Sequence, residues 1–246
     1  MTEWKARRFW QAVSITEIEG GFGVALDGRP VQTPARAPLR LPTRAMAGAV
    51  AEEWRAQEGE LRPRTMPVTR AANAAVDTVA ANPAAVAAII TAYGDSDLLC
   101  YRAESPEALR AREAEGWDPL LDWAADTFGA RLVPVAGVMH VPQDPHALRR
   151  LAAPVEDMDP FELTALHDLV CLSGSLVIGL AAILDVDDIG RLWQLSRLGE
   201  TWQEEQWGVD EEARAQAERK ELEFRAAKRF NDLARGRSRA APGTSP

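Results

Sequence analysis

The first forty residues alternate between apolar and polar positions with the two-residue period of β-strands. Four segments show this alternation: 9–15, 22–26, 31–33 and 39–41. Asp27 and Gly28 lie between two of these segments, and Asp-Gly favours a two-residue turn with positive φ at both positions. The pattern therefore predicts a small antiparallel meander at the start of the chain.

The period then changes to that of an α-helix. Thr43 is placed to cap a helix in which Met46, Val50 and Trp54 recur every four residues and form one apolar stripe. Gly59 is expected to end this helix. Because a small meander cannot bury its own apolar face, we expect the helix to pack on it, with Trp54 as a packing residue between the two.

A capping residue followed by proline marks the expected start of most later helices. The capping oxygen accepts from free backbone N–H groups, and proline at the first helical position has no N–H to leave unpaired. Helices are therefore predicted to begin near residues 83, 106, 119, 145 and 160. One further helix is expected near 68–80, and Gly94 and Gly129 are expected to stop helices.

Three longer helices are predicted in the last third of the chain, over 160–184, 187–207 and 210–234. Gly208 separates the last two, and Asp210 suits the positive end of the dipole of the third. The segments 97–102 and 131–135 are expected to form short strands or extended connectors.

Together these elements predict an α+β fold, in which a small N-terminal antiparallel β-rich domain precedes a larger, mostly α-helical domain. The β-rich domain with its one packed helix is expected to cover residues 1–66, and the helical domain residues 67–235. Residues 236–246 are rich in Arg, Ser, Gly and Pro, which predicts a flexible tail.

The charge balance narrows the classes of function. The 246 residues include 28 basic and 37 acidic side chains, which gives a net charge of −9. No global basic field therefore exists to hold a nucleic acid or an anionic membrane. The longest apolar-rich run, 169–184, is shorter than the ~20 residues that a membrane span needs. We expect no nucleic-acid partner and no membrane insertion.

The cysteine count and the first residues indicate the compartment. Only Cys100 and Cys171 are present, too few for a disulfide framework, which favours a reducing cytosol. A secretory signal consists of a basic region followed by an apolar run, and the first residues of the chain do not show this pattern. We therefore expect a cytoplasmic protein.

Motifs for catalysis and cofactor binding are mostly missing from the sequence. It contains no G-x-x-x-x-G-K-[ST] phosphate loop, no H-E-x-x-H and no C-x-x-C. The glycines at 20, 21 and 23 precede a strand, so they indicate a turn and not a dinucleotide site. We expect neither a metal nor a cofactor.

His167 and Cys171 form a candidate catalytic pair, since residues four apart share one face of a helix. A cysteine beside a histidine can act as an activated nucleophile. The alternative is a small apolar cysteine on a core helix next to a histidine on its polar face. Nothing in the sequence identifies a third group to orient the histidine, which favours the alternative.

The most distinctive stretch lies between residues 193 and 208. On a 3.6-residue period, Arg197, Glu200, Glu204 and Trp207 lie along one side of the predicted helix. The pattern is typical either of a two-sided core helix with one i, i+3 ion pair or of a polar and aromatic recognition strip on a rigid helix. Periodicity alone favours the core helix.

The pattern S-x-x-x-E-x-x-Q-x-x-x-W-G is formed in this stretch by Ser196, Glu200, Gln203, Trp207 and Gly208. It resembles the C-terminal signature of the assembly chaperones for the α subunit of the F1 ATPase. Other segments agree in the same order along the chain: 8–10, 26–34, 53–57, 97–102, 117–123 and 174–176. Gly199 departs from the pattern, since an acidic residue or another helix former is expected there.

The resemblance implies a non-enzymatic, ATP-independent chaperone, here a bacterial member of the family. Such a protein binds the unassembled α subunit and prevents its aggregation before the F1 hexamer assembles. One-to-one capping of the α subunit favours a monomer. We place partner binding on a partly acidic face formed by Glu200, Gln203, Glu204 and Trp207.

Trp117 and Trp123 flank Asp118-Pro119 and are assigned to the core. Two other functions stay open: a cytosolic enzyme of unknown reaction that uses Cys171 and His167, or a general holdase without a preferred client.

Overall fold

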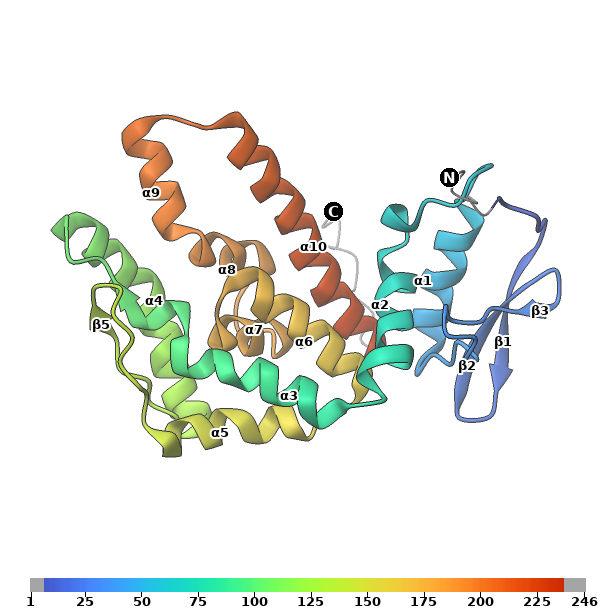
Figure 1. The fold of residues 1–246 in the computed structure, drawn as a ribbon, viewed down its shortest axis with the longest axis horizontal. Helices are drawn as coiled ribbons and strands as arrows, with labels where there is room; N and C mark the ends of the chain where they lie inside the picture. Colours follow the sequence, from blue (N-terminus) through green and yellow to red (C-terminus); the bar gives the residue numbers. More distant parts are fainter. Residues whose placement is uncertain (1–6, 237–246) are drawn as a thin grey trace, which may run out of the picture. The chain divides into compact units, whose positions relative to one another are not determined.

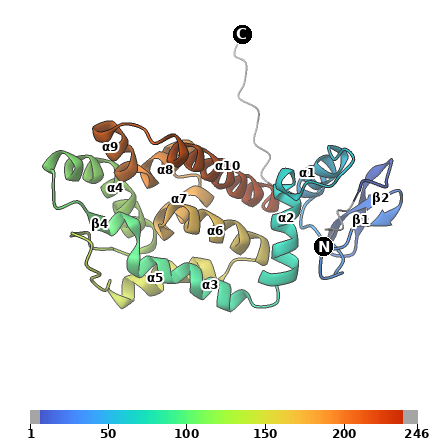
Figure 2. The same ribbon diagram turned by 45° about the horizontal axis from the view of Figure 1, so that its top comes forward.

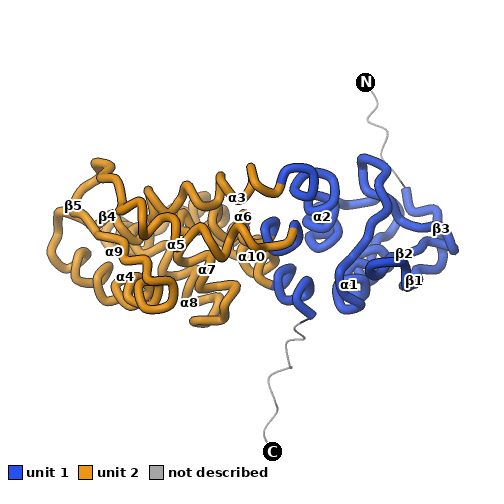
Figure 3. The backbone as a smooth tube through the Cα atoms, turned by 90° about the horizontal axis from the view of Figure 1, so that it is seen from below, with its two compact units in different colours: residues 1–82, 160–164, 229–246 blue, residues 83–159, 165–228 orange. Residues whose placement is uncertain are grey.

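The computed structural model of the chain describes residues 7–236, and they form two compact units (Figure 3). Within that range, unit 1 comprises residues 7–82, 160–164 and 229–236, and unit 2 comprises 83–159 and 165–228. The predicted domain boundary after residue 66 thus lies inside unit 1, and the predicted division into domains stays a prediction. Apart from Gly236, the predicted tail lies outside the described residues.

Unit 1 contains the predicted meander (Figure 1). Strands β1 (Val13–Ile18), β2 (Gly21–Leu26) and β3 (Arg29–Pro30) form an antiparallel sheet in the order β1-β2-β3. Asp27 and Gly28 have φ of 47° and 80°, which confirms the turn that their sequence predicts. The segments expected at 31–33 and 39–41 form only isolated bridges, such as the one between Phe22 and Leu41.

Helix α1 (Arg44–Arg55) packs on this sheet as predicted. The Thr43 hydroxyl accepts from the Met46 N–H at 3.1 Å, so the expected cap is present. The helix ends at Arg55 and not at Gly59. Trp54 is half-buried, and its ring meets that of buried Trp10 edge-on at 5.1 Å, which agrees with a packing role.

A side chain near the end of α1 caps the start of the next helix. The Glu53 carboxylate accepts from the backbone N–H groups of Val68 and Thr69, both at 2.8 Å, at the beginning of α2 (Pro67–Ala74). A short 3₁₀ turn (Pro63–Thr65) precedes α2, and a π-helical turn (Ala75–Val79) follows it. These pieces together form the helix expected near 68–80.

Unit 2 is mostly helical (Figures 1 and 2). Its helices are α3 (Pro83–Ala92), α4 (Glu107–Phe128), α5 (Pro145–Glu156), α7 (Leu176–Ile183), α8 (Ile189–Ser196) and α9 (Leu198–Trp207). Helices α6 (Pro160–Ser173) and α10 (Glu211–Ala234) contribute residues to both units. All eight residues of α7 are buried, and α7 contacts α4 and α8, which places it in the core of unit 2.

Two 3₁₀ turns and a small parallel sheet connect these helices. The turns are Tyr93–Ser96 and Leu98–Cys100, and strand β4 (Tyr101–Arg102) pairs with β5 (Val135–Ala136). The two segments that were expected to be short strands or connectors therefore contain both.

The helix start predicted at Asp118-Pro119 is wrong, because α4 continues through Pro119 without interruption. Asp118 forms an ion pair with Arg102 at 2.7 Å instead of capping a helix. Pro119 has no N–H for the carbonyl of Glu115, and Glu115 is exposed, so water can hydrate that carbonyl. Tertiary contacts therefore override the local start signal.

Two helices that were predicted as continuous are each divided in two. Gly174, with φ of 73°, ends α6, and the Ser175 hydroxyl accepts from the Ile178 N–H at 3.0 Å to start α7. Arg197, with φ of −114° and ψ of 14°, separates α8 from α9. The predicted helices 160–184 and 187–207 are therefore wrong in length.

The α+β fold class is confirmed, with a small antiparallel sheet followed by a helix-rich region. Within residues 7–236, no single helix has both the length and the apolar composition of a membrane span. One bent helical pair, Pro67–Val79 with Pro83–Cys100, meets that requirement by length and composition only.

Candidate functional site

The structure brings all four predicted partner-binding residues together in one groove of unit 2. Glu200, Gln203, Glu204 and Trp207 line it from α9, and its volume is about 370 Å³. The opposite side belongs to the first half of α10 and consists of Ala213, Gln216, Ala217 and Lys220. We call this feature the α9–α10 groove.

The α10 side of the groove was not anticipated from the sequence. Ala213 and Lys220 lie three or four residues from both Gln216 and Ala217, so the four residues share one helix face. That spacing could have identified the shared face, but the many charged residues of α10 predict only a solvent-exposed helix. Only the return of α10 beside α9 makes this face one side of the groove.

Short-range chemistry sets the reversal between the two helices. Gly208, with φ of 90°, ends α9 directly after Trp207. The Asp210 carboxylate then accepts from the N–H groups of Glu212 and Ala213 at 2.9 and 3.2 Å and starts α10. Trp207 is thereby held at a helix end with 87% of its surface exposed.

The groove carries charges of both signs. Arg197 forms an ion pair with Glu200 at 3.1 Å, and its guanidinium lies 5.9 Å from the centre of the Trp193 ring. Glu204 and Asp210 add negative charge on one side, and Lys220 adds positive charge on the other. Exposed ion pairs of this kind contribute little to stability.

Helix α4 holds α9 in place. A Cβ atom on Gly116 would lie 2.9 Å from a methyl group of Leu195 and 3.1 Å from one of Leu198, so the helices approach closely there. Arg112 of α4 also binds Glu205 of α9 through two hydrogen bonds of 2.6 and 3.0 Å. These hydrogen bonds lower the pKa of the Glu205 carboxyl.

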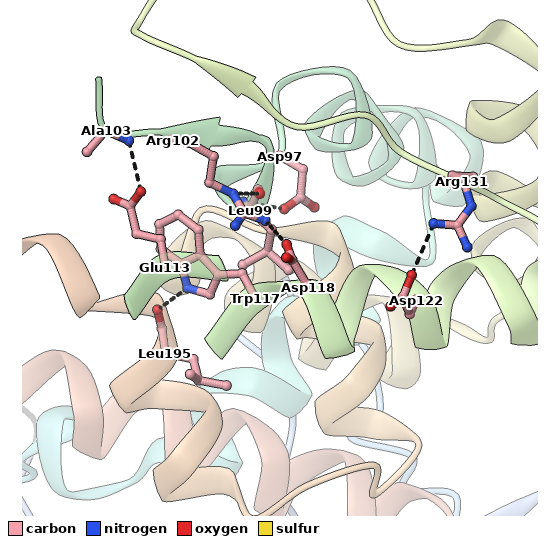
Figure 4. Close-up of polar contacts among 10 residues, drawn as sticks. All are labelled: Asp97, Leu99, Arg102, Ala103, Glu113, Trp117, Asp118, Asp122, Arg131 and Leu195. Atoms are coloured by element: carbon pink, nitrogen blue, oxygen red, sulfur yellow. Dashed lines mark hydrogen bonds and ion pairs between the residues drawn. The ribbon is translucent and has the colours of Figure 1, made fainter. Parts of the chain in front are cut away.

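Helix α8 is fixed to α4 by a polar cluster, which we call the α4–α8 anchor: Arg102, Trp117, Asp118 and Leu195 (Figure 4). All of these residues except Asp118, at the edge of the cluster, are buried. The Trp117 Nε1–H donates to the Leu195 carbonyl at 2.8 Å, and Trp117 is 3% exposed. The Arg102 guanidinium lies 5.2 Å from the centre of the Trp117 ring, where a cation–π interaction is favourable. Arg102 also donates to Asp118 at 2.7 Å and to the Leu99 carbonyl at 3.0 Å.

The anchor explains two of the segments that carry the sequence resemblance. Segment 97–102 supplies Arg102, and segment 117–123 supplies Trp117 and Asp118. These residues join α4 to the end of α8, two residues before the junction with α9. Trp117 is confirmed as a core residue, and Trp123 is half-buried with its ring 5.4 Å from that of Phe128.

Asp97 ties the same segment to the core helix α7. Its carboxylate accepts from the N–H groups of Leu99 and Val177, both at 3.0 Å, and the side chain is fully buried. Removal from water raises the pKa of Asp97 to about 6, although the hydrogen bonds from Ser175 and the backbone act in the opposite direction. Asp97 is therefore a structural group of the buried framework.

Helix α10 is anchored only in its second half. Phe224 is completely buried, and its ring lies 5.5 Å from that of Trp193 on α8. Residues 211–220, in contrast, are exposed or half-buried. The groove thus forms between the parts of α9 and α10 whose residues are exposed or half-buried.

The second candidate pair, His167 and Cys171, does meet on one face of α6. The Cys171 Sγ lies 3.6 Å from the His167 Nε2. The interpretation of Cys171 as a buried core residue is wrong, since this cysteine is exposed and Cys100 is the buried one. Within residues 7–236, no group of three His, Cys, Asp or Glu side chains could hold a metal ion.

Comparisons with known proteins agree along nearly the whole chain. Residues 7–125 match the family model described as ATP12 chaperone protein. Atp12 from Paracoccus denitrificans is 53% identical, with a TM-score of 0.91, and the match covers 94% of this chain and 100% of that one. A variant of the same protein, in which one aspartate is replaced by lysine, matches with the same identity and TM-score over 95% and 100% of the two chains.

A solved structure from a second organism is also similar. The Atu1473 protein, a candidate chaperone from Agrobacterium tumefaciens, is 41% identical with a TM-score of 0.89. The match covers 92% of this chain and 85% of that one. The α9–α10 groove lies beyond the part of the chain that the family model matches.

Proposed function

This chain belongs to the ATP12 chaperone protein family, and from that premise we propose that it is an assembly chaperone of the F1 ATPase. It binds the unassembled α subunit and prevents its aggregation before the hexamer forms. It acts in the bacterial cytoplasm as a monomer and catalyses no reaction. The observation that carries the proposal is the likeness to Atp12 over nearly the full length of both chains.

We propose that the α9–α10 groove is the surface that contacts the α subunit. An unassembled subunit exposes a surface that its neighbours later cover, and such a patch favours aggregation. A chaperone must release its client, and reversible interfaces are more polar than permanent ones. The groove combines one exposed tryptophan with charges of both signs, which suits such an interface.

The test is capture of purified F1 α subunit by the purified chain. The wild type is expected to retain α and to reduce light scattering while α refolds, whereas the β subunit is not retained. The double variant Glu200→Lys, Trp207→Ala removes the exposed ring and reverses one charge. It is expected to weaken binding by at least tenfold, because a central aromatic anchor typically contributes about 2 kcal/mol or more.

A matched control variant lies on the same helix pair outside the groove. Leu222 is 69% exposed and Glu223 is exposed, and neither lines the groove. The double variant Leu222→Ala, Glu223→Lys therefore makes the same charge change and also removes one exposed apolar side chain. It is expected to bind α normally. Equal binding by the two double variants would remove the groove from the proposal.

A general holdase would give a different result in competition. An excess of an unrelated unfolded protein should not displace α from a dedicated chaperone, but it should displace α from a holdase. The Cys171→Ser variant addresses the enzyme alternative, since a chaperone that acts through the groove keeps its full activity without that thiol. Loss of α capture in Cys171→Ser would contradict the assignment to the groove.

A further inference from the structure

A cluster of reactive side chains lies on α6, outside the α9–α10 groove, and centres on Cys171. The thiol is exposed, and its Sγ lies 3.6 Å from the His167 Nε2. The other ring nitrogen of His167, Nδ1, lies 3.1 Å from Oδ1 of Asp168. Cys171 is thus not an isolated thiol, because a base and a group that orients the base accompany it.

A second element contributes to the cluster. The hydroxyl of Tyr93, from the 3₁₀ turn Tyr93–Ser96, donates to the Cys171 Sγ at 3.7 Å. A donor aimed at the sulfur stabilises negative charge on it. The thiol therefore receives support from two directions, from its own helix through His167 and from the turn through Tyr93.

The contacts within the cluster shift the pKa values of His167 and Tyr93. The hydrogen bond to Asp168 raises the pKa of His167, which favours the protonated imidazole beside the sulfur, although partial burial opposes this. The contact with Cys171 raises the pKa of Tyr93, so that hydroxyl keeps its proton and remains a donor. A neighbouring imidazolium is one of the features that mark reactive cysteines.

The second cysteine provides an internal reference. Cys100 is 2% exposed, and burial raises the pKa of its thiol to about 12, with a further contribution from the Asp97 charge. Both access and charge therefore oppose reaction at Cys100. Any difference in reactivity between the two thiols of the folded chain reports on their surroundings.

We propose that Cys171 is a modification site, where the thiol forms a mixed disulfide with a low-molecular-weight disulfide of the glutathione type. The Cys171 proton passes to the His167 Nε2, and the thiolate attacks one sulfur of the disulfide. A new S–S bond forms to Cys171 while the original S–S bond breaks. The leaving thiolate takes the proton from His167, so the products are the modified chain and one free thiol.

The test uses the full-length, reduced protein and oxidised glutathione at neutral pH, with intact mass and peptide mapping as readouts. One adduct per chain is expected on Cys171 and none on Cys100. The Cys171→Ser variant should give no adduct. His167→Gln is expected to lower the rate by about threefold or more, because glutamine cannot accept the thiol proton as the sulfur attacks.

Three comparisons separate this site from an ordinary surface thiol. His146→Gln, at an exposed histidine on α5, should leave the rate unchanged. In concentrated urea the wild type and His167→Gln should react at the same rate, because the cluster no longer exists. The proposal is overturned if folded Cys171 reacts no faster than the thiols of the unfolded chain, or if His167→Gln reacts at the wild-type rate when folded.

Discussion

The α4–α8 anchor and the α9–α10 groove use the same residue types in opposite ways. Each pairs a tryptophan with an arginine and a carboxylate. In the anchor, Trp117 is 3% exposed and its N–H is bonded, whereas in the groove Trp207 is 87% exposed. We infer that burial decides whether such a set of residues stabilises the fold or can contact a partner.

The two regions are also connected in the chain. Leu195 accepts the Trp117 hydrogen bond, and Glu200 begins the acidic side of the groove one helix later. A rigid framework under an exposed surface keeps the geometry of a binding site. The comparison therefore predicts a separation of effects: anchor variants lower stability, and groove variants lower binding.

The largest effect is expected for Trp117→Ala. The substitution removes a buried ring, its hydrogen bond to Leu195 and its contact with Arg102. It should lower the free energy of unfolding by about 4 kcal/mol, as measured by urea denaturation. Trp207→Ala is the matched control, and a similar loss in both variants would contradict the comparison.

A smaller effect is expected where the two regions meet, at Gly116→Val. The added side chain would press against Leu195 and Leu198, which approach the glycine most closely. Overpacking should cost about 2 kcal/mol in unfolding free energy. If α4 positions the groove, capture of the α subunit should also fall, although no groove residue has changed. Unchanged capture at reduced stability would show that the position of α9 does not matter.

Asp97 makes the stability of the framework depend on pH. Its pKa of about 6 in the folded chain lies above the ordinary value of 3.8, so the folded state holds the proton more tightly. This contribution to stability is complete at low pH and is lost as the pH rises through about 6. Between pH 5 and 7 the loss should be about 1 kcal/mol.

The measurement for Asp97 compares unfolding free energies of the wild type and Asp97→Asn across that pH range. The variant is expected to be less stable overall, because one of the two backbone N–H groups loses its acceptor. Its unfolding free energy should, however, lack the fall with rising pH that is due to Asp97. Parallel curves for the two proteins would contradict the raised pKa.

The smallest effect on stability is expected for Glu200→Lys, Trp207→Ala. The Trp207 ring and the Glu200 carboxylate are exposed, and the Arg197–Glu200 ion pair lies at the surface. Substitutions of this kind usually change the unfolding free energy by less than about 0.5 kcal/mol. A fall in melting temperature comparable with that of Gly116→Val would assign these residues to the fold.

Several elements of the fold could be predicted because their signals are local. The positive φ of Asp27 and Gly28, the cap of α1 by Thr43 and the reversal at Gly208 each depend on a few neighbouring residues. The four α9 residues of the groove were named because the family resemblance points to this stretch, and residues three and four apart lie close together on a helix.

Other features depend on partners that are distant in sequence. Asp118 has the sequence of a cap, but Arg102 takes its carboxylate and α4 continues. Cysteine is a residue type that is often buried, but Cys171 lies at the surface, where it accepts a hydrogen bond from the Tyr93 hydroxyl of a separate turn. Such choices between a local partner and a distant one cannot be made from periodicity alone.

The fold class, most helix starts and the face of α9 on which we place the binding of the partner follow from the amino-acid sequence alone. Propensity, capping and turn chemistry act over fewer than about ten residues, so short segments contain that information. Packing of the whole chain sets where the long helices divide, that Cys171 is exposed and that α10 supplies the second wall of the groove. Burial and long-range pairing are properties of the packed chain, because each requires side chains that the backbone brings together only on folding.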